Sequence, residues 1–278
     1  MKLEKIWAVY FSGTGTTRRT VERIAGGIAS RLNLPAESVD FSRPAVRQET
    51  LGFGEKDLVV FGTPVYAGRV PNVLLPFLRE RIVGGGALAV PVVLFGNRNY
   101  DDALIELRNI LAADGMHPIA AGAFVGEHSF SRVLGADRPN AEDEALMDEF
   151  AARVAELATG LDAAPVKSVA VRGQEPLRPY YTPRDRAGNP INILKVKPKT
   201  DPSRCGGCGL CADLCPMGSI DPADVSAVRG ICIKCCACVK GCPTGAKFFD
   251  DAGYLYHQHE LEAQYARPAE NEVFYIQL

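Results

Sequence analysis

Along the first 160 positions, short apolar runs and amphipathic stretches follow one another, which predicts strands alternating with helices. Short apolar runs typical of buried strands occupy residues 6–11, 58–61, 92–95 and 119–125, with a shorter strand expected at 39–41. Amphipathic stretches that predict helices lie at 17–32, in a segment ending near Ile82, at 101–113 and at 141–161. Because strands alternating with helices form βαβ units, we expect a parallel sheet covered by helices on both faces.

The pattern changes between residues 165 and 200. This stretch holds six prolines, and eight Lys or Arg residues against two acidic ones. Such a composition indicates a linker without much regular structure. We interpret it as a chain tied down on an acidic surface, with a docking site for an acidic partner as the alternative. Beyond residue 250, a short helix at 260–266 and a strand at 273–278 are expected to pack back on a domain.

Composition and charge exclude some classes of protein. The 278-residue chain is 47% hydrophobic and 23% charged, which is ordinary for a globular protein of about two domains. Its net charge of −2 argues against a nucleic-acid-binding protein. The longest apolar run, 87–95, is interrupted by Pro91 and too short to span a membrane. The apolar segment near the N-terminus is too short for an export signal, so a cytoplasmic protein is expected.

All nine cysteines lie between Cys205 and Cys242. Eight of them form the run C-x2-C-x2-C-x3-C-P twice, with a period of 27 residues, and this spacing is typical of two [4Fe–4S] clusters. In such runs the fourth cysteine binds the cluster of the other motif, which assigns Cys205, Cys208, Cys211 and Cys242 to one cluster. The second cluster then takes Cys232, Cys235, Cys238 and Cys215. A zinc site is usually built from two separated CxxC pairs, so zinc is the weaker reading. The ninth cysteine, Cys236, breaks the spacing and is expected not to be a ligand.

This region resembles the two-cluster bacterial ferredoxins over about 45 residues. Crossed ligation holds two clusters close together, which suits electron transfer between them. The resemblance implies a small α+β ferredoxin domain at 201–250, preceded by the linker at 163–200 and followed by a tail at 251–278.

Three loops of the first half follow apolar strands, where open α/β sheets bind ligands. The first, 11–17, lacks the GxGxxG and GK[ST] patterns but offers hydroxyls and backbone N–H groups at a helix start, which suit one phosphate group. Its alternative is a Ser/Thr-rich helix cap. The loops at 62–71 and 95–102 each present a tyrosine able to stack on a flat ring.

Residues 1–162 resemble a flavodoxin, which implies a doubly wound parallel sheet of order 2-1-3-4-5 and a bound FMN. By position, the FMN phosphate would be held by Ser12, Gly13, Thr14, Gly15, Thr16 and Thr17. One side of the flavin ring would be lined by Thr63, Pro64, Val65 and Tyr66, and the other by Gly96, Asn97 and Tyr100. Arg69 and Arg98 would lie near the reduced ring or on the surface. His128, after the fifth strand, is a candidate proton donor.

The whole chain is similar to fused flavodoxin–ferredoxin proteins of anaerobic microbes. The resemblance implies an iron–sulfur flavoprotein that passes electrons between an external redox partner, two [4Fe–4S] clusters and FMN. The partner would be a ferredoxin, a flavodoxin or an oxidoreductase, and the sequence leaves a homodimer open. The alternative is an FMN-dependent reductase of a small unsaturated molecule or quinone, fed through the clusters.

Overall fold

The computed structural model describes residues 2–277. Its main sheet has the order β11-β8-β6-β4-β1-β2, with β7 also paired to β6. All strand pairs of this sheet are parallel except that of β11 with β8. Without β11, the order is that of the expected doubly wound flavodoxin-like sheet, so the predicted fold is confirmed. The strands are β1 (Lys5–Tyr10), β2 (Ala36–Asp40), β4 (Asp57–Pro64), β6 (Leu88–Phe95), β7 (His117–Pro118), β8 (Ala120–Val125) and β11 (Glu272–Tyr275).

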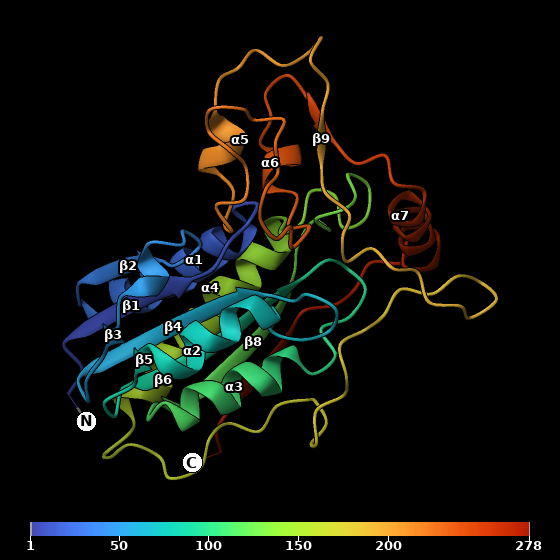
Figure 1. Ribbon diagram of the computed structural model, residues 1–278. Helices are drawn as coiled ribbons and strands as arrows, with labels where there is room; N and C mark the ends of the chain where they lie inside the picture. The colour runs from blue at the N-terminus through green and yellow to red at the C-terminus, as the bar shows by residue number, and fades with distance from the viewer. Residues whose placement is uncertain (1, 278) are drawn as a thin grey trace.

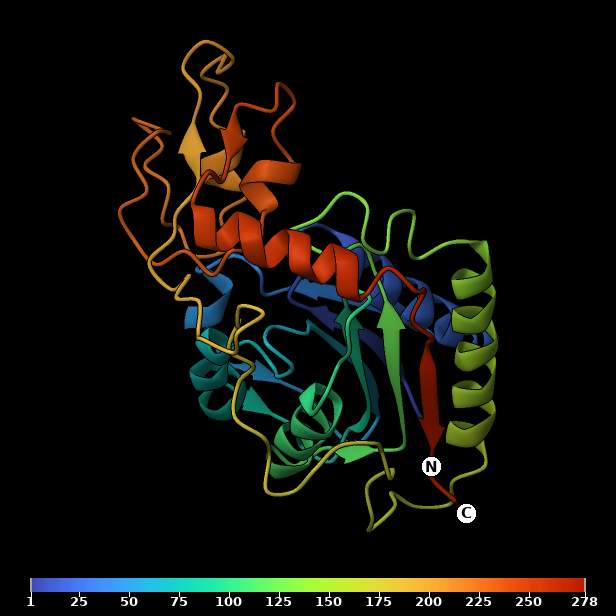
Figure 2. The same ribbon diagram turned by 90° about the vertical axis from the view of Figure 1, so that its right-hand side faces the viewer.

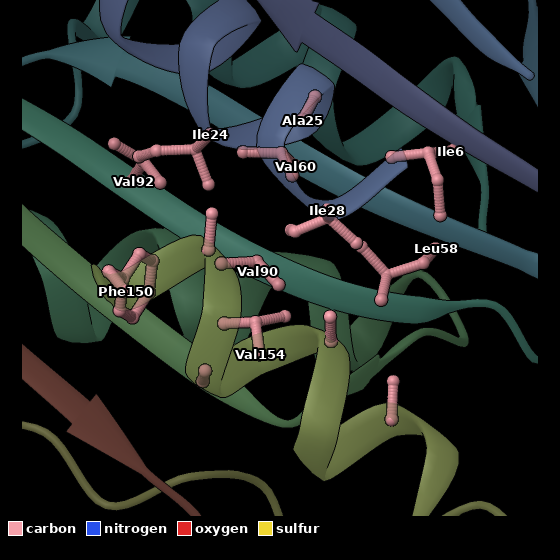
Figure 3. Packing of buried hydrophobic residues seen from close by; sticks show 14 of the residues in the cluster. Ile6, Ile24, Ala25, Ile28, Leu58, Val60, Val90, Val92, Phe150 and Val154 are labelled. Carbon is pink, nitrogen blue, oxygen red and sulfur yellow. The ribbon is translucent and has the colours of Figure 1, made fainter. Parts of the chain in front are cut away.

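Helices cover both faces of this sheet, and each face has its own apolar core (Figure 1). The long helices are α1 (Thr16–Leu32), α3 (Ala103–Ala113) and α4 (Ala141–Thr159). A short helix, α2 (Leu75–Glu80), lies between β4 and β6 in the chain. Figure 3 shows Ile24 and Ile28 of α1 and Phe150 and Val154 of α4 packed over Val90 in the first core. The remaining short elements of this half are η1 (Val46–Gln48), β3 (Leu51–Gly52), η2 (Asn72–Leu74) and β5 (Ile82–Val83).

Pro91 lies inside β6, so the strand begins earlier than the one expected at 92–95. It pairs with Phe61 of β4 on one side. On the other side the partner of β6 changes at this point, from β7 beside Leu88 and Ala89 to β8 beside Val92. A proline is therefore tolerated in a central strand because one ladder is interrupted there.

The cysteine-rich region forms a small unit above the carboxyl ends of the sheet strands (Figure 1). It contains β9 (Lys199–Thr200) paired antiparallel with β10 (Lys247–Phe248), and the single-turn helices α5 (Leu210–Asp213) and α6 (Ala237–Lys240). The pairing of β9 with β10 holds together the two ends of this loop-rich module.

The C-terminal tail returns to the first half of the chain. A thirteen-residue helix, α7 (Ala252–Gln264), begins after Asp251, whose side chain accepts the Tyr254 N–H as a cap. It therefore starts earlier and is longer than the helix expected at 260–266. Figure 2 shows α7 crossing above the end of β8, after which β11 descends antiparallel beside it. No helix of residues 2–277 is long and apolar enough to cross a membrane.

Candidate functional site

The loop after β1 is built to receive an anion. Gly15 adopts a left-handed conformation (φ 89°) immediately before α1 and has no side chain to cap the helix. Ser12 fixes the loop, because its N–H donates to Ser42 Oγ (2.7 Å) and its Oγ accepts the Arg18 N–H (3.2 Å). The open N–H groups of a seventeen-residue helix, with Thr16 and Thr17 in its first turn, suit a phosphate group.

A cavity of about 60 Å³ extends from this loop along the ends of β1, β4, β6 and β8. It is lined by Gly13, Thr14, Thr16, Thr17, Pro64, Val65, Tyr66, Leu94, Phe95, Gly96, Gly126, Glu127, His128, Ser129 and Cys235. Most of the residues expected around FMN from the first two loops therefore lie around one cavity. Its chemistry, with hydroxyls and helix N–H groups at one end and an aromatic ring at the other, fits the phosphate and chain of a flavin mononucleotide.

A second cavity of about 220 Å³ continues from the first, because both are lined by Val65, Tyr66, Gly96, His128 and Ser129. Residues from outside the flavodoxin-like half cover it: Tyr181, Pro183, Ile193, Leu194, Ile233, Lys234, His257 and Leu261. Glycine at position 96 is required by this packing, since a Cβ there would lie 2.5 Å from the His128 ring. The size and aromatic lining of this space suit the flavin ring.

Two residues expected beside the flavin ring, Tyr100 and Asn97, have partners elsewhere in the fold. Tyr100 is fully buried, and its OH donates to Glu272 (2.6 Å) while Arg172 lies over its ring. Tyr100 thus holds β11, and the expectation that it stacks on the flavin is wrong. The Asn97 side chain accepts the Ala269 N–H and donates to the carbonyls of Tyr265 and Arg267, so it fixes the chain after α7.

Thr63 and Arg69 also differ from expectation. Thr63 is buried at the end of β4, and its hydroxyl has no partner among the described residues. Arg69 forms a buried ion pair with Glu106 (2.6 Å) and donates to the Arg178 carbonyl, so its charge is used inside the fold. Arg98 does reach the second cavity, where it pairs with Asp101 and stacks on Tyr181.

His128 lines both cavities, but its chemistry differs from that of an imidazolium acid. Burial lowers the pKa of His128 to about 3, and the charges of Lys240 and Arg98 act in the same direction. Its Nδ1 accepts the Phe130 N–H (3.1 Å), which places the remaining proton on Nε2. At neutral pH His128 is therefore a neutral ring that offers one N–H hydrogen bond, and its role as a proton donor stays a prediction.

Each predicted set of four cysteines lines its own cavity. Cys205, Cys208, Cys211 and Cys242 line one of about 80 Å³, and Cys215, Cys232, Cys235 and Cys238 line a narrower apolar one together with Cys236. All nine cysteines are free of disulfides. Among residues 2–277, no three His, Cys, Asp or Glu side chains converge tightly enough for a single metal ion. Thiolates spread around a cavity fit a four-iron cluster better than a zinc ion, whose ligands all approach one point.

The two motifs repeat in three dimensions as well as in sequence. Gly207 and Gly209 have left-handed backbones in the first, and Lys234 and Cys236, 27 residues later, have them in the second. Cys236 therefore occupies a turn position between two ligands, with its sulfur 3.3 Å from the Tyr254 OH. The two cysteines that cross between motifs also match. Cys215 Sγ accepts the Ser219 N–H, and Cys242 Sγ accepts the Ala246 N–H.

The second cysteine set is the one that borders the flavin cavity. Cys235 lines both spaces, and a Cβ placed on Gly13 would lie 3.0 Å from the Cys235 Cβ and 3.5 Å from the Tyr66 OH. Burial raises the pKa of Tyr66 well above its usual value, and the neighbouring cysteines add to this. In the first set, Cys208 is exposed to solvent.

Two basic side chains hold the cysteine module against the sheet, and sequence reasoning missed both. Lys240 Nζ donates to a Glu127 carboxylate oxygen and to the carbonyls of His128 (2.7 Å) and Ser131 (2.8 Å). Arg47 donates to the Pro216 carbonyl (2.5 Å), next to Cys215. The sequence did hold one indication, because Lys240 lies between Cys238 and Cys242, where a charged side chain needs a partner.

The basic linker is tied to acidic residues outside it. Its ion pairs are Arg172–Glu272, Arg178–Asp102, Arg186–Glu260 and Lys199–Asp250. Asp102 is completely buried, and the hydrogen bonds from Arg178 hold the pKa of its carboxyl below the usual range. These pairs favour the tethering interpretation of the linker over a free docking site.

Comparisons with known proteins agree with this architecture. A family model described as a flavodoxin domain matches residues 8–103, and one described as a 4Fe-4S binding domain matches residues 198–221. Curated proteins give no match. A flavodoxin from the domain Archaea is 17% identical, with 56% of this chain and 99% of that chain covered and a TM-score of 0.41. A flavodoxin of Fusobacterium nucleatum bound to flavin mononucleotide is 13% identical, covering 55% and 98%, with a TM-score of 0.37.

A WrbA-like flavodoxin of Agrobacterium tumefaciens is 17% identical, covering 56% and 98%, with a TM-score of 0.35. The flavodoxin match implies FMN, and the second match implies a [4Fe–4S] cluster. The chain therefore contains a flavodoxin domain at residues 8–103 and a 4Fe-4S ferredoxin-type domain at residues 198–221, a combination that supports electron transfer in general.

Proposed function

We propose that this protein carries electrons in the order first cluster, second cluster, FMN, in either direction, in exchange with a redox protein. Cys205, Cys208, Cys211 and Cys242 would hold the first [4Fe–4S] cluster, and Cys215, Cys232, Cys235 and Cys238 the second. The observation that carries the proposal is the position of Cys235, which borders both its own cysteine cavity and the flavin cavity. The working units would be residues 1–162, the linker 163–200, the cluster module 201–250 and the tail 251–278.

When bound, FMN exchanges one or two electrons and each cluster one, so the three groups convert between single-electron and paired transfer. Within the chain, Ser12–Thr17 would hold the phosphate, and Pro64–Tyr66 with Gly96 would flank the ring. His128 would donate an Nε2–H hydrogen bond to the flavin. The N–H bonds to Cys215 and Cys242 would stabilise thiolate charge and thereby tune the clusters.

The surroundings of the two ends favour a carrier over a reductase of small molecules. Tyr181, Leu194 and Lys234 line the ring part of the flavin cavity and take up space beside the ring. Cys208, in contrast, is exposed to solvent. A partner protein would therefore reach the first cluster at Cys208, whereas residues of the linker and the cluster module limit the room for a substrate beside the ring.

The test uses the full chain purified without oxygen and loaded with iron, sulfide and FMN. We expect one FMN and about eight iron atoms per chain, and rapid flavin reduction by a reduced single-electron ferredoxin. Cys208→Ser and Cys232→Ser, each removing one cluster, should both slow this reduction. Failure of the wild-type chain to bind FMN would refute the flavin half of the proposal. If Cys232→Ser reduced its flavin at the wild-type rate, the proposed order would be wrong.

A further inference from the structure

A buried histidine of α7 reaches the flavin cavity from outside the flavodoxin domain. His257 lies on the buried face of α7 with Tyr254 and Leu261, and only 6% of it is exposed. Its ring stacks on Tyr181 (centroids 6.0 Å apart, planes 28° apart) and meets the Phe130 ring edge-on. These contacts fix the imidazole in one position on the wall of the 220 Å³ cavity.

The polar atoms of this ring have no partner within the described chain. Apart from its ring contacts, the His257 side chain makes no hydrogen bond or ion pair to residues 2–277. Neither ring nitrogen is among the fully enclosed unpaired atoms, so both retain some accessible surface, and the residue lines the cavity. Buried polar groups are nearly always hydrogen-bonded, because leaving one unpaired costs free energy. A buried imidazole that faces an open cavity and lacks a partner therefore indicates a ligand.

The protonation state of His257 indicates which hydrogen-bonding groups its ligand carries. Burial lowers the pKa of His257, and the nearby Arg98 adds to the effect, so the ring is neutral and has one donor and one acceptor nitrogen. The same cavity is lined by Tyr66, His128 and Lys234. A flat heteroaromatic ring with both carbonyl oxygens and N–H groups on its edge matches this set, and the flavin ring has both.

We propose that His257 hydrogen-bonds the edge of the FMN ring, so that α7 completes the flavin site. This inference rests on the proposed function, since it takes FMN as the occupant of the cavity. It goes further by assigning a flavin contact to a helix that follows the cluster module. The flavin potential would then depend on the docking of α7, which links the environment of the flavin to the second half of the chain.

The test compares three variants of the full, cluster-loaded chain. His257→Phe keeps an aromatic ring but loses both nitrogens, His257→Gln keeps a donor and an acceptor, and His259→Phe changes an exposed residue of the same helix. FMN affinity is measured by flavin fluorescence, and the flavin and cluster midpoint potentials by anaerobic spectroelectrochemistry. We expect His257→Phe to weaken FMN binding about tenfold, the effect of one hydrogen bond, and to shift the flavin potential with the cluster potentials unchanged.

His257→Gln should recover most of the affinity, and His259→Phe should match the wild type. An unchanged affinity and flavin potential in His257→Phe would overturn the proposal, as would an equal loss in His259→Phe. A purely structural role would lower the melting temperature and leave the flavin potential in place. If His257→Phe does not fold, His257→Leu, which also lacks both nitrogens, replaces it under the same criteria. A wild-type chain that fails to bind FMN refutes the proposed function itself and is recognised before any variant is made.

Discussion

Gly13 of the phosphate loop lies directly against Cys235 of the second cysteine motif. A Cβ on Gly13 would come within 3.0 Å of the Cys235 Cβ, closer than such atoms normally approach. The absence of a side chain at this position therefore sets how near the second cysteine motif can come to the loop after β1. Since electron transfer becomes slower with distance, this glycine links loop geometry to rate.

Gly13→Ala tests that relationship. The added methyl group must push the cysteine loop away by a few tenths of an ångström, so we expect weaker FMN binding and slower flavin reduction, with a larger loss in Gly13→Val. Stopped-flow absorbance after mixing with a reduced ferredoxin measures the rate. Gly26→Ala is the matched control, because no atom lies within 4 Å of its Cβ position in α1. It should raise stability by roughly 0.5–1 kcal/mol and leave the rate unchanged. Equal rates in Gly13→Val and wild type would contradict the role given to this contact.

Lys240 is expected to fix the cluster module on the sheet. Lys240→Met removes the donor to Glu127, His128 and Ser131. Hydrogen bonds from a charged group contribute about 1.5–3 kcal/mol, so the free energy of unfolding should fall by about 2 kcal/mol. Amide hydrogen exchange in the loop 126–131 should accelerate, as measured by mass spectrometry. Lys195→Met, at an exposed position of the linker, is the control and should change neither quantity. Unchanged exchange in Lys240→Met would show that other contacts hold the module.

Cys236 and Cys235 are adjacent but should respond oppositely to substitution. Cys236 has a left-handed backbone (φ 58°) at the position where the first motif has Gly209, so Cys236→Gly relieves backbone strain. The substitution also removes the contact between the Cys236 sulfur and the Tyr254 OH, which opposes the gain in stability from the relieved strain. Both clusters should remain, with about eight iron atoms per chain. Cys235→Ser should lose the second cluster and retain about four iron atoms. Iron analysis and cluster absorbance of both variants measure how many clusters remain. Loss of iron in Cys236→Gly would show that Cys236 is a ligand.

The sequence predicts what depends on spacing and leaves out what depends on side-chain direction. The tandem cysteine spacing was enough to sort eight cysteines into the two sets that line separate cavities. The same loop reasoning grouped Tyr66 with Thr14, Thr16 and Thr17, and these residues line one cavity. It misplaced Tyr100, because periodicity does not say on which side of a loop a side chain lies, and here Glu272 attracts the hydroxyl into the core.

The contribution of α7 was also invisible in the sequence. Its residues have little amphipathic character, and the contacts of His257 with Phe130 and Tyr181 join segments far apart in the chain. A buried histidine in a polar-looking tail gives no local signal of burial. The same holds for the contacts of Lys240 and Arg47 between the cysteine module and the sheet domain, which join residues 109 or more positions apart.

Asp114 gives the stability of the chain a specific dependence on pH. Burial at the end of α3 raises the pKa of Asp114 from 3.8 to about 6, Arg79 opposes this, and one carboxylate oxygen is buried without a partner. The folded state therefore favours the protonated form. Its stabilising contribution is complete below pH 3.8 and is lost as the pH rises through 6.

Asp114→Asn removes this ionisation. A shift of two pKa units corresponds to nearly 3 kcal/mol, but solvent screens this partly exposed group, so we expect a gain of about 1 kcal/mol at pH 7.5. At pH 4 the variant and the wild type should unfold alike. Chemical denaturation of the full chain at both pH values measures the difference, with the exposed Glu49→Gln as the control that should follow the wild type throughout. A gain of equal size at pH 4 and 7.5 would mean that packing or hydrogen bonding of the amide, not the lost charge, stabilises the variant.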